Sequence, residues 1–254
     1  MINQKNENSN FKAVVLAAGI GSRINEITKS IPKTMIEING KCIYEYILKN
    51  LIDNNIKSVV FVIGYRADIL EPILRNKCTE LGINLEIVMN EQYKTTNTMY
   101  SLWLARNLLK SDFIYLHGDL LFSSKMLSLF IKSSHENCVL VDKNNPLDWD
   151  DAMKIISNDN LLKYMSKSIT VSEMDGVAIG IYKFNKHGSE ILFKTIGNLI
   201  EAGITKNWVS EAINIMSKHI NVNLQISKLH AWADVDNLID LESANKVIKK
   251  MELE

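Results

Sequence analysis

The sequence lacks several features that would point to particular classes of protein. Its three cysteines, Cys42, Cys78 and Cys138, lie far apart and form neither a zinc-binding spacing nor a disulfide framework. This usage fits a reducing compartment, so we expect a cytoplasmic protein. No apolar run approaches the roughly 20 residues of a membrane span, and the polar first residues include no hydrophobic signal core. We therefore expect no membrane partner.

An excess of charge of one sign is also lacking. The 29 Lys and Arg residues equal the 29 Asp and Glu residues, so the formal net charge is zero. Because nucleic-acid-binding domains usually carry a basic patch, we expect no nucleic-acid partner. Apolar residues, in contrast, make up 46% of the 254 residues, enough for a large core. We predict a disordered tail at residues 1–10 and a single domain at residues 11–254.

Strand and helix patterns alternate along the first half of the chain. Continuous apolar runs predict buried strands, and apolar residues at helical spacing predict the helices between them. Alternation at this rhythm is typical of a doubly wound, mostly parallel sheet, and burial on both faces explains why the strands are apolar throughout. We expect strands at residues 12–18, 58–63, 85–89 and 112–117, and helices at residues 43–54, 67–81 and 98–109.

The pattern loosens after residue 119. Strand signals there are shorter, and two of them suit a small antiparallel pair. We therefore expect an α/β fold of three α/β/α layers around a mixed, mostly parallel sheet. The predicted strands of this half are residues 138–142, 153–156, 161–165, 178–184 and 223–226, and the predicted helices are residues 124–133, 187–201, 208–217 and 238–250.

The segment from Phe11 to Gly40 carries the strongest functional signal. Its predicted strand leads into the run LAAGIGSR at residues 16–23, and Pro32-Lys33 follows. Glycines let backbone N–H groups turn toward an anion, and the nearby arginine and lysine add positive charge, so this loop suits a polyphosphate. Two familiar loops do not fit: Ile24 occupies the third glycine position of the dinucleotide fingerprint, and no Gly-Lys-Ser/Thr closes a P-loop.

These residues resemble the LAAGxGxR…PK signature of the nucleotidyltransferase superfamily, which activates sugar phosphates and phospho-alcohols. The resemblance extends over essentially the whole chain from Phe11. The run NTMYSL at residues 97–102 and the late Trp-x-Asp-x-Asp at residues 232–236 resemble the small cytidylyltransferases of the CTP:phosphocholine type. The resemblance implies a Rossmann-like, glycosyltransferase-A-like fold, with a nucleotide-binding half at residues 11–120 and an acceptor-binding half at residues 121–254.

The resemblance also implies roles for single residues. Lys33 would stabilise charge that develops on the α-phosphate, and Arg23 would hold the β- and γ-phosphates. Asp119 and Asp236 would hold Mg²⁺ through carboxylate oxygens, with Asp234 either a third ligand or a residue behind the site. No general base is required, because the acceptor phosphate is already ionised. The implied nucleotide-binding residues are Leu16, Ala17, Ala18, Gly19, Gly21, Ser22, Arg23, Asn90, Asn97 and Thr98.

The acceptor site is predicted from fewer residues. Lys154 would bind the acceptor phosphate, with an ordinary solvated lysine as the alternative. Trp149 and Trp208 would form a cage for an ammonium group, because indole faces attract cations; core packing is the alternative for each. The remaining predicted acceptor-binding residues are Glu211, which would add negative charge to this cage, and Asp175-Gly176, which either contact the acceptor or form a hairpin turn.

The leading hypothesis is a Mg²⁺-dependent cytidylyltransferase. It would transfer CMP from CTP to a small phosphorylated alcohol or phosphonate and release pyrophosphate. Acceptors that stay open are phosphocholine, an aminoalkyl phosphonate, a phosphorylated amino acid amide and inositol phosphate. Two other functions stay open: a sugar-1-phosphate nucleotidyltransferase that uses UTP or dTTP, and a nucleotide-binding regulatory subunit without catalysis. The sequence does not decide the oligomeric state, and a homodimer is one open choice.

Overall fold

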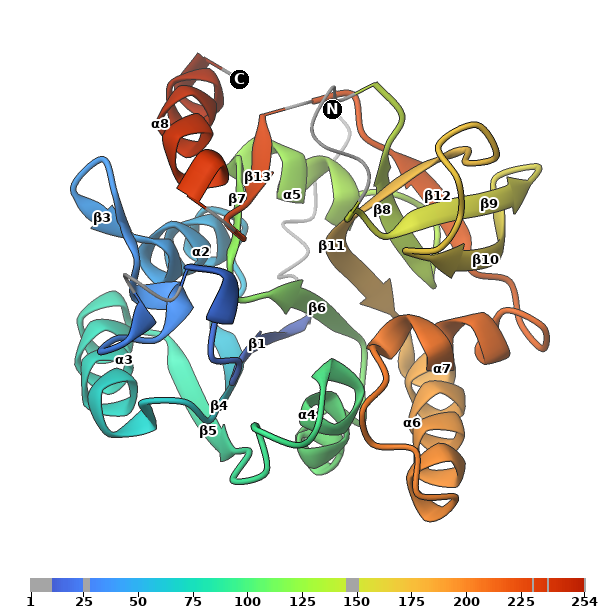
Figure 1. Ribbon diagram of the computed structural model, residues 1–254, viewed down its shortest axis with the longest axis horizontal. Helices are drawn as coiled ribbons and strands as arrows, with labels where there is room; N and C mark the ends of the chain where they lie inside the picture. Colours follow the sequence, from blue (N-terminus) through green and yellow to red (C-terminus); the bar gives the residue numbers. More distant parts are fainter. Residues whose placement is uncertain (1–10, 25–27, 145–150, 230, 237, 254) are drawn as a thin grey trace, which may run out of the picture.

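A mixed sheet of nine strands runs through the middle of the described part of the protein (Figure 1). The computed structural model describes residues 11–24, 28–144, 151–229, 231–236 and 238–253, so the predicted tail at residues 1–10, Trp149 and His230 lie outside it. The strand order is β5-β4-β1-β6-β11-β8-β12-β10-β9. The bounds are β1 Lys12–Ala17, β4 Ser58–Ile63, β5 Asn84–Met89, β6 Phe113–His117, β8 Cys138–Asp142, β9 Lys154–Asn158, β10 Leu161–Ser166, β11 Gly176–Phe184 and β12 Asn223–Ile226.

The two halves of the sheet differ in direction. Strands β5, β4, β1 and β6 pair in parallel, as the alternating pattern predicts. Strand β11 then lies antiparallel between β6 and β8, and β10 lies antiparallel between β12 and β9. The predicted antiparallel pair of the second half is therefore confirmed as β9 and β10. The carboxyl ends of β1 and β6 lie side by side, which is where an open α/β sheet usually binds its ligand.

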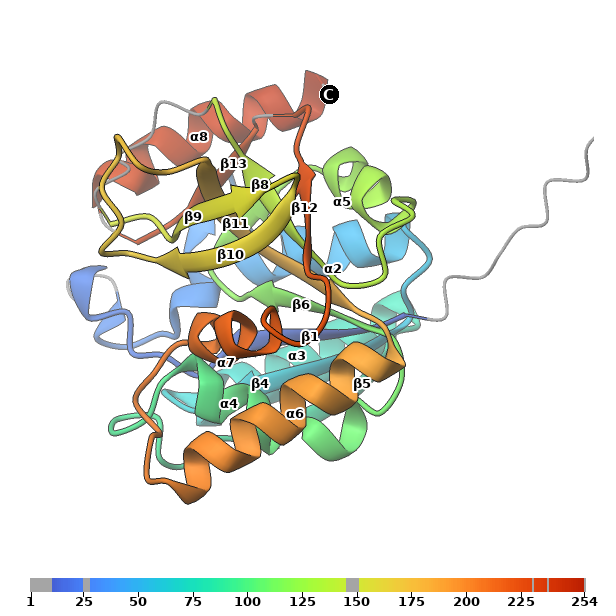
Figure 2. The same ribbon diagram turned by 90° about the vertical axis from the view of Figure 1, so that its right-hand side faces the viewer.

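Helices cover both faces of the sheet, so the predicted three-layer α/β/α fold is confirmed. Alternate residues of each central strand face opposite layers: Val15 packs on one side and Val14 on the other. Figure 2 shows α6 below β1 and β6, and α8 above them. One layer holds α2 Ile43–Asp53, α3 Ala67–Leu81, α5 Ser124–Ile131 and α8 Leu238–Leu253, and the other holds α4 Thr98–Leu104, α6 Lys186–Glu201 and α7 Val209–Met216.

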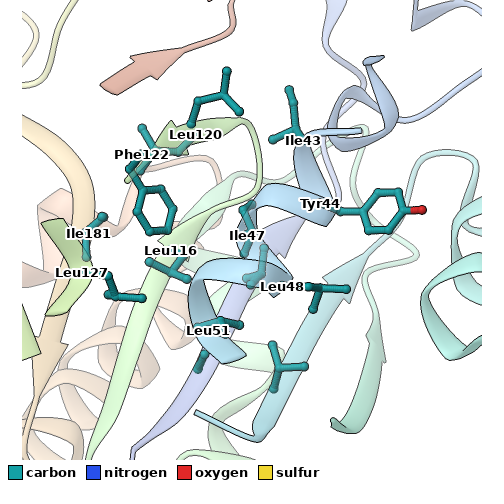
Figure 3. Close-up of a cluster of buried hydrophobic side chains, with 14 of the residues drawn as sticks. Ile43, Tyr44, Ile47, Leu48, Leu51, Leu116, Leu120, Phe122, Leu127 and Ile181 are labelled. Carbon is teal, nitrogen blue, oxygen red and sulfur yellow. The ribbon is translucent and has the colours of Figure 1, made fainter. Parts of the chain in front are cut away.

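Helix α2 shows how the spacing of apolar residues fixes this packing. Ile43, Ile47 and Leu51 recur at helical spacing and are fully buried against the sheet (Figure 3). The helix begins after Cys42, whose backbone N–H donates to the Glu45 carboxylate at 3.0 Å. Each fully buried side chain of this size stabilises the fold by about 1.5–3 kcal/mol. The helix thereby packs on one face of the sheet, next to the turn that contains Lys33.

The structure differs from the sequence prediction mainly in short elements. The helix predicted at residues 98–109 ends at Leu104 and continues as the 3-10 turn η3 Arg106–Leu108. Four strands of two or three residues were not predicted, because such short strands show no alternation: β2 Glu37–Ile38, β3 Lys41–Cys42, β7 Leu120–Phe122 and β13 Trp232–Asp234. Among the described residues, no helix is both long and apolar enough to cross a bilayer.

Candidate active site

The site begins where the parallel strands β1 and β6 end. Leu16 of β1 lies opposite His117 of β6, and the Gly118 N–H donates to the Leu16 carbonyl at 3.0 Å. A Cβ at Gly118 would lie 2.5 Å from that carbonyl oxygen, so the close approach requires glycine. This approach carries Asp119, the next residue, to the edge of the glycine-containing loop after β1.

The loop closes on itself through Thr28. Its hydroxyl donates to the Gly21 carbonyl at 2.9 Å and to the Ile24 carbonyl at 3.1 Å. Gly21 has φ +68, a conformation that favours glycine, and a Cβ there would press on Thr28 and Lys33. The second glycine of the loop is therefore needed for conformation as well as for access to an anion. Lys33 is held directly beside the loop.

The short antiparallel pair β7 and β13 brings Asp119 close to Asp234 and Asp236. Strand β7 follows Asp119 directly, and β13 ends at Asp234, which pairs with Leu120. The Val235 N–H donates to the Asp119 carbonyl at 3.1 Å. Asp119, Asp234 and Asp236 thus converge at one point although more than 100 residues separate the first from the others.

Lys33 lies at the centre of these acids. Its Nζ donates to the carboxylates of both Asp119 and Asp236, and its side chain is only 12% exposed. Burial lowers the pKa of Lys33, but the surrounding Asp119, Asp234 and Asp236 carboxylates raise it by a larger amount, so the net effect is a raised pKa. The ammonium group therefore stays charged at neutral pH. Arg23 adds a second cation, with its NH2 atom 3.1 Å from Asp236 Oδ2.

The acids fit a divalent metal. Asp234 Oδ1 is buried and has no hydrogen-bond partner, which leaves an oxygen available for an ion. His117, Asp119 and Asp234 can bring one ligand atom each within 4.8 Å of one another. Burial and the neighbouring Asp119 raise the pKa of Asp234. Burial also raises the pKa of Asp119, but Lys33, His117 and hydrogen bonds together lower it to about 2. Crowded carboxylate oxygens of this kind suit a hard cation such as Mg²⁺.

Two cavities meet at the acidic cluster, which is formed by Asp119, Asp234 and Asp236. The loop cavity, about 260 Å³, follows the glycine-containing loop, and the aromatic cavity, about 280 Å³, lies on the other side of the acids. Arg23, Asp119 and Asp236 line both. Two ligands could therefore bind with their reacting groups at the shared residues. The loop cavity is also lined by Leu16, Ala17, Gly19, Gly21, Ser22, Lys33 and Asn97, and the aromatic cavity by Thr98, Tyr115, His117, Asp151, Lys167, Tyr182, Trp208, Trp232 and Asp234.

Three predicted nucleotide-binding residues lie outside the loop cavity. Ala18 is buried behind the loop. Asn90 is 1% exposed, and its side-chain amide donates to the hydroxyls of Ser101 at 2.9 Å and Thr96 at 3.2 Å, so it orders the segment before α4 instead. Thr98 lies in the aromatic cavity, where its hydroxyl accepts a hydrogen bond from the backbone N–H of Val209 at 3.1 Å.

Most residues of the predicted acceptor site do not line the aromatic cavity. Lys154 is 2% exposed, and its Nζ donates to the Lys167 carbonyl at 2.8 Å. Asp175 accepts hydrogen bonds from the backbone N–H and the hydroxyl of Ser157 in β9. Gly176 begins β11, where a Cβ would lie 2.7 Å from a Val141 methyl. Glu211 is in the first turn of α7 and lines neither cavity, whereas Trp208 does line the aromatic one.

Besides Arg23, the aromatic cavity contains a second cation, Lys167, which the sequence did not indicate. Its Nζ lies 5.4 Å from the centre of the Trp208 ring and 2.8 Å from Asp151 Oδ1. Trp208, one of the two predicted cage residues, therefore already faces a cation of the chain itself. Lys167 directly follows β10 and has neither a motif nor a spacing that would separate it from a solvated lysine. A lysine just beyond the end of a predicted strand was the only available signal.

The chain is similar to several known proteins. A family model described as nucleotidyl transferase matches residues 12–251. The bifunctional protein GlmU of Methanococcus maripaludis is 29% identical over 94% of this chain and 56% of the relative, so the chain spans about half the length of such relatives. The CTP:phosphoglutamine cytidylyltransferase of Campylobacter jejuni is 24% identical, over 91% of this chain and 98% of the relative.

Among solved structures, the inositol-1-phosphate CTP transferase from T. maritima matches with a TM-score of 0.78. It covers 95% of this chain and 96% of the other, at 22% identity. At that identity the likeness shows a shared fold.

Proposed function

Because this chain belongs to the nucleotidyl transferase family, we propose that it is a cytidylyltransferase. It transfers CMP from CTP to a small acceptor that carries a phosphate or a phosphonate, and it releases pyrophosphate. The choice of CTP is supported by the similarity to a cytidylyltransferase of C. jejuni over nearly the full length of both chains.

The observation that carries the proposal is the meeting of the two cavities at Arg23, Asp119 and Asp236. The glycine-containing side suits a triphosphate, because Gly19 leaves open space above the backbone and Lys33 supplies charge. The aromatic side contains Lys167, a cation for a second phosphate. A transfer between two phosphates needs both groups at one point, and the shared residues provide that point.

The reaction follows from this placement. An oxygen of the acceptor phosphate attacks the α-phosphorus of CTP and forms a new O–P bond, while the bond from the α-phosphorus to the bridging oxygen breaks and pyrophosphate leaves with that electron pair. Lys33 stabilises the charge on the α-phosphate, and Arg23 holds the departing phosphates. The attacking oxygen is already ionised, so His117 need not act as a base.

The acidic cluster supplies the place for a metal. Asp119, Asp234 and Asp236 would hold Mg²⁺, which neutralises phosphate charge and orients the reacting groups when it is bound. The unpartnered Asp234 oxygen is the feature of this chain that fits that ion. Without such a cation, the three carboxylates would repel two phosphorylated ligands.

The aromatic cavity suits a small acceptor. Lys167 lies over the Trp208 ring, so Trp208 orients the lysine toward the shared residues. Tyr115 and Tyr182 stack at 5.0 Å between ring centres and form a flat wall of the same cavity. We propose that the acceptor phosphate binds Lys167 and that the rest of the acceptor, a short alcohol, aminoalkyl or amide chain, packs on the tyrosines.

A nucleotide panel tests the proposed function. Pyrophosphate release is measured with CTP, UTP and dTTP against phosphocholine, phosphoethanolamine, 2-aminoethylphosphonate, inositol phosphate and sugar 1-phosphates. We expect release with CTP and one phosphorylated alcohol, amide or phosphonate. Faster release with UTP or dTTP and a sugar phosphate would replace the proposal by the sugar-nucleotide function. Tight CTP binding without turnover for any acceptor would favour a regulatory subunit.

Replacing Lys167 with alanine is expected to raise the KM for the acceptor by about tenfold or more, because a charged hydrogen bond to a phosphate contributes about 1.5–3 kcal/mol. The KM for CTP is expected to change by less than about twofold. Lys163→Ala is the matched control, since Lys163 is an exposed lysine of the neighbouring strand β10 and lines neither cavity. Steady-state kinetics with each substrate varied in turn separates the two effects; an equal rise in both KM values would contradict the assignment.

A further inference from the structure

A single carboxylate connects the two cations that the proposed reaction assigns to different substrates. Asp151 Oδ2 accepts a hydrogen bond from Arg23, and its other oxygen lies 2.8 Å from Lys167 Nζ. Partial burial raises the pKa of Asp151, but Lys167 and Arg23 lower it more, so the carboxylate stays ionised at neutral pH. Asp151 lines the aromatic cavity, immediately beside the residues shared with the loop cavity.

The position of Asp151 is one that a phosphate would need. Arg23 is the cation of the triphosphate side, and Lys167 is the cation of the acceptor side. An anion that bonds to both Arg23 and Lys167 lies between the positions that the proposed function gives to the triphosphate and to the acceptor phosphate. The cluster around it already contains Asp119, Asp234 and Asp236, so a further carboxylate opposes the binding of anions in general.

We infer that the Asp151 carboxylate competes with the phosphates of both substrates and thereby couples their binding. Binding of the nucleoside triphosphate at Arg23 loosens the hold of Asp151 on Lys167 and makes Lys167 available to the acceptor. This inference rests on the proposed function, because that function assigns the two cations to two ligands. In the empty protein one carboxylate satisfies both cations. A triphosphate at Arg23 removes one of the two contacts that hold Asp151 in place.

The coupling follows from the shared carboxylate. The first anion to bind must break one contact of a carboxylate that two cations hold, whereas the second meets a carboxylate that only one cation still holds and displaces it at a lower cost. Coupling between two ligands is reciprocal, so each should tighten the other by the same factor. Repulsion between the two bound anions acts in the opposite direction, but it is present with or without Asp151. The effect of Asp151 is therefore the difference in coupling between the wild type and a variant without this charge.

Binding calorimetry with inorganic probes tests the inference independently of the reaction. Tripolyphosphate serves as the probe for the triphosphate side and inorganic phosphate for the acceptor side, each alone and with the other at saturation. In Asp151→Asn, tripolyphosphate alone should bind about three- to tenfold more tightly than in the wild type, the range expected from two exposed ion pairs. The factor by which tripolyphosphate tightens phosphate binding should be larger in the wild type, by about threefold or more.

Two further variants keep the test decisive. Asp151→Ala should behave like Asp151→Asn, since both remove the charge. Asp68→Asn removes the partner of Arg66 in another exposed Arg–Asp pair, which lines neither cavity, and should leave both probes unchanged. Weaker tripolyphosphate binding in Asp151→Asn, or the same coupling factor as in the wild type, would overturn the inference. Neither outcome depends on whether CTP is the true substrate, so a failure of the proposed function would show separately, as absent turnover in the nucleotide panel.

Discussion

Replacing Lys33 with alanine is expected to lower kcat by about 10²- to 10³-fold and to leave the KM for CTP within about threefold of the wild-type value. Lys33 is the most buried of the three cations Arg23, Lys33 and Lys167, and the proposed function assigns it to the charge that develops on the α-phosphate. A preorganised donor of this kind contributes mainly to the transition state, and removing one such donor typically costs that much in rate. Steady-state and single-turnover rates of pyrophosphate release measure the loss.

The control for Lys33→Ala is Lys29→Ala, which removes an exposed lysine from the same segment. It is expected to retain activity within about twofold. Lys33→Ala also leaves the carboxylates of Asp119 and Asp236 without their shared partner, so the variant should be less stable than the wild type. Its rates should therefore be measured at a temperature well below its own Tm. A kcat equal to that of the wild type would remove Lys33 from the mechanism, whereas a large rise in the KM for CTP alone would make it a binding residue.

The sheet and its helices could be predicted because their signal is local. The run at residues 58–63 is apolar throughout and forms β4 with the predicted bounds, and Ala67–Leu81 forms the predicted α3. Gly82 ends that helix in a left-handed conformation, at the position where the pattern of apolar residues stops. Burial on two faces requires apolar side chains at every position of a strand, and the sequence records that requirement directly.

The site could be predicted only in part, because its geometry depends on contacts between distant segments. Gly21, Lys33 and Asp119 belong to recognisable motifs, and the structure brings all three together. Strands β7 and β13, which join Asp119 to Asp234, have three residues each and no periodicity that a sequence reveals. The placement of the lysines depends on such contacts as well: Lys154 lies in β9 and points its Nζ to a backbone carbonyl, while Lys167 beyond the end of β10 reaches the cavity.

Replacing Asp119 with asparagine is expected to lower kcat by about 10³-fold and to reduce the stabilisation of the protein by Mg²⁺ and CTP. A metal ion that neutralises phosphate charge contributes several kcal/mol to the transition state, and each factor of ten corresponds to about 1.4 kcal/mol. A ligand at 100 times its Kd stabilises the folded state by about 2.7 kcal/mol, which corresponds to roughly 5–10 °C in Tm for a chain of this size. Calorimetric Tm values with and without Mg²⁺, at fixed CTP, measure this stabilisation without any turnover.

Asp119 suits this test because its carboxylate is held ionised by Lys33, with a pKa of about 2, so that asparagine removes a charge that is present at every working pH. Asp53→Asn is the matched control, since Asp53 is an exposed aspartate on α2 that pairs with Lys49 and lies outside both cavities. The control should keep the full Mg²⁺-dependent rise in Tm. If Asp119→Asn kept it as well, Asp119 would not hold the metal, and the unpartnered oxygen of Asp234 would have to bind it without Asp119. A lost rise in Tm together with wild-type turnover would instead separate metal binding from catalysis and contradict the proposed role of the acidic cluster.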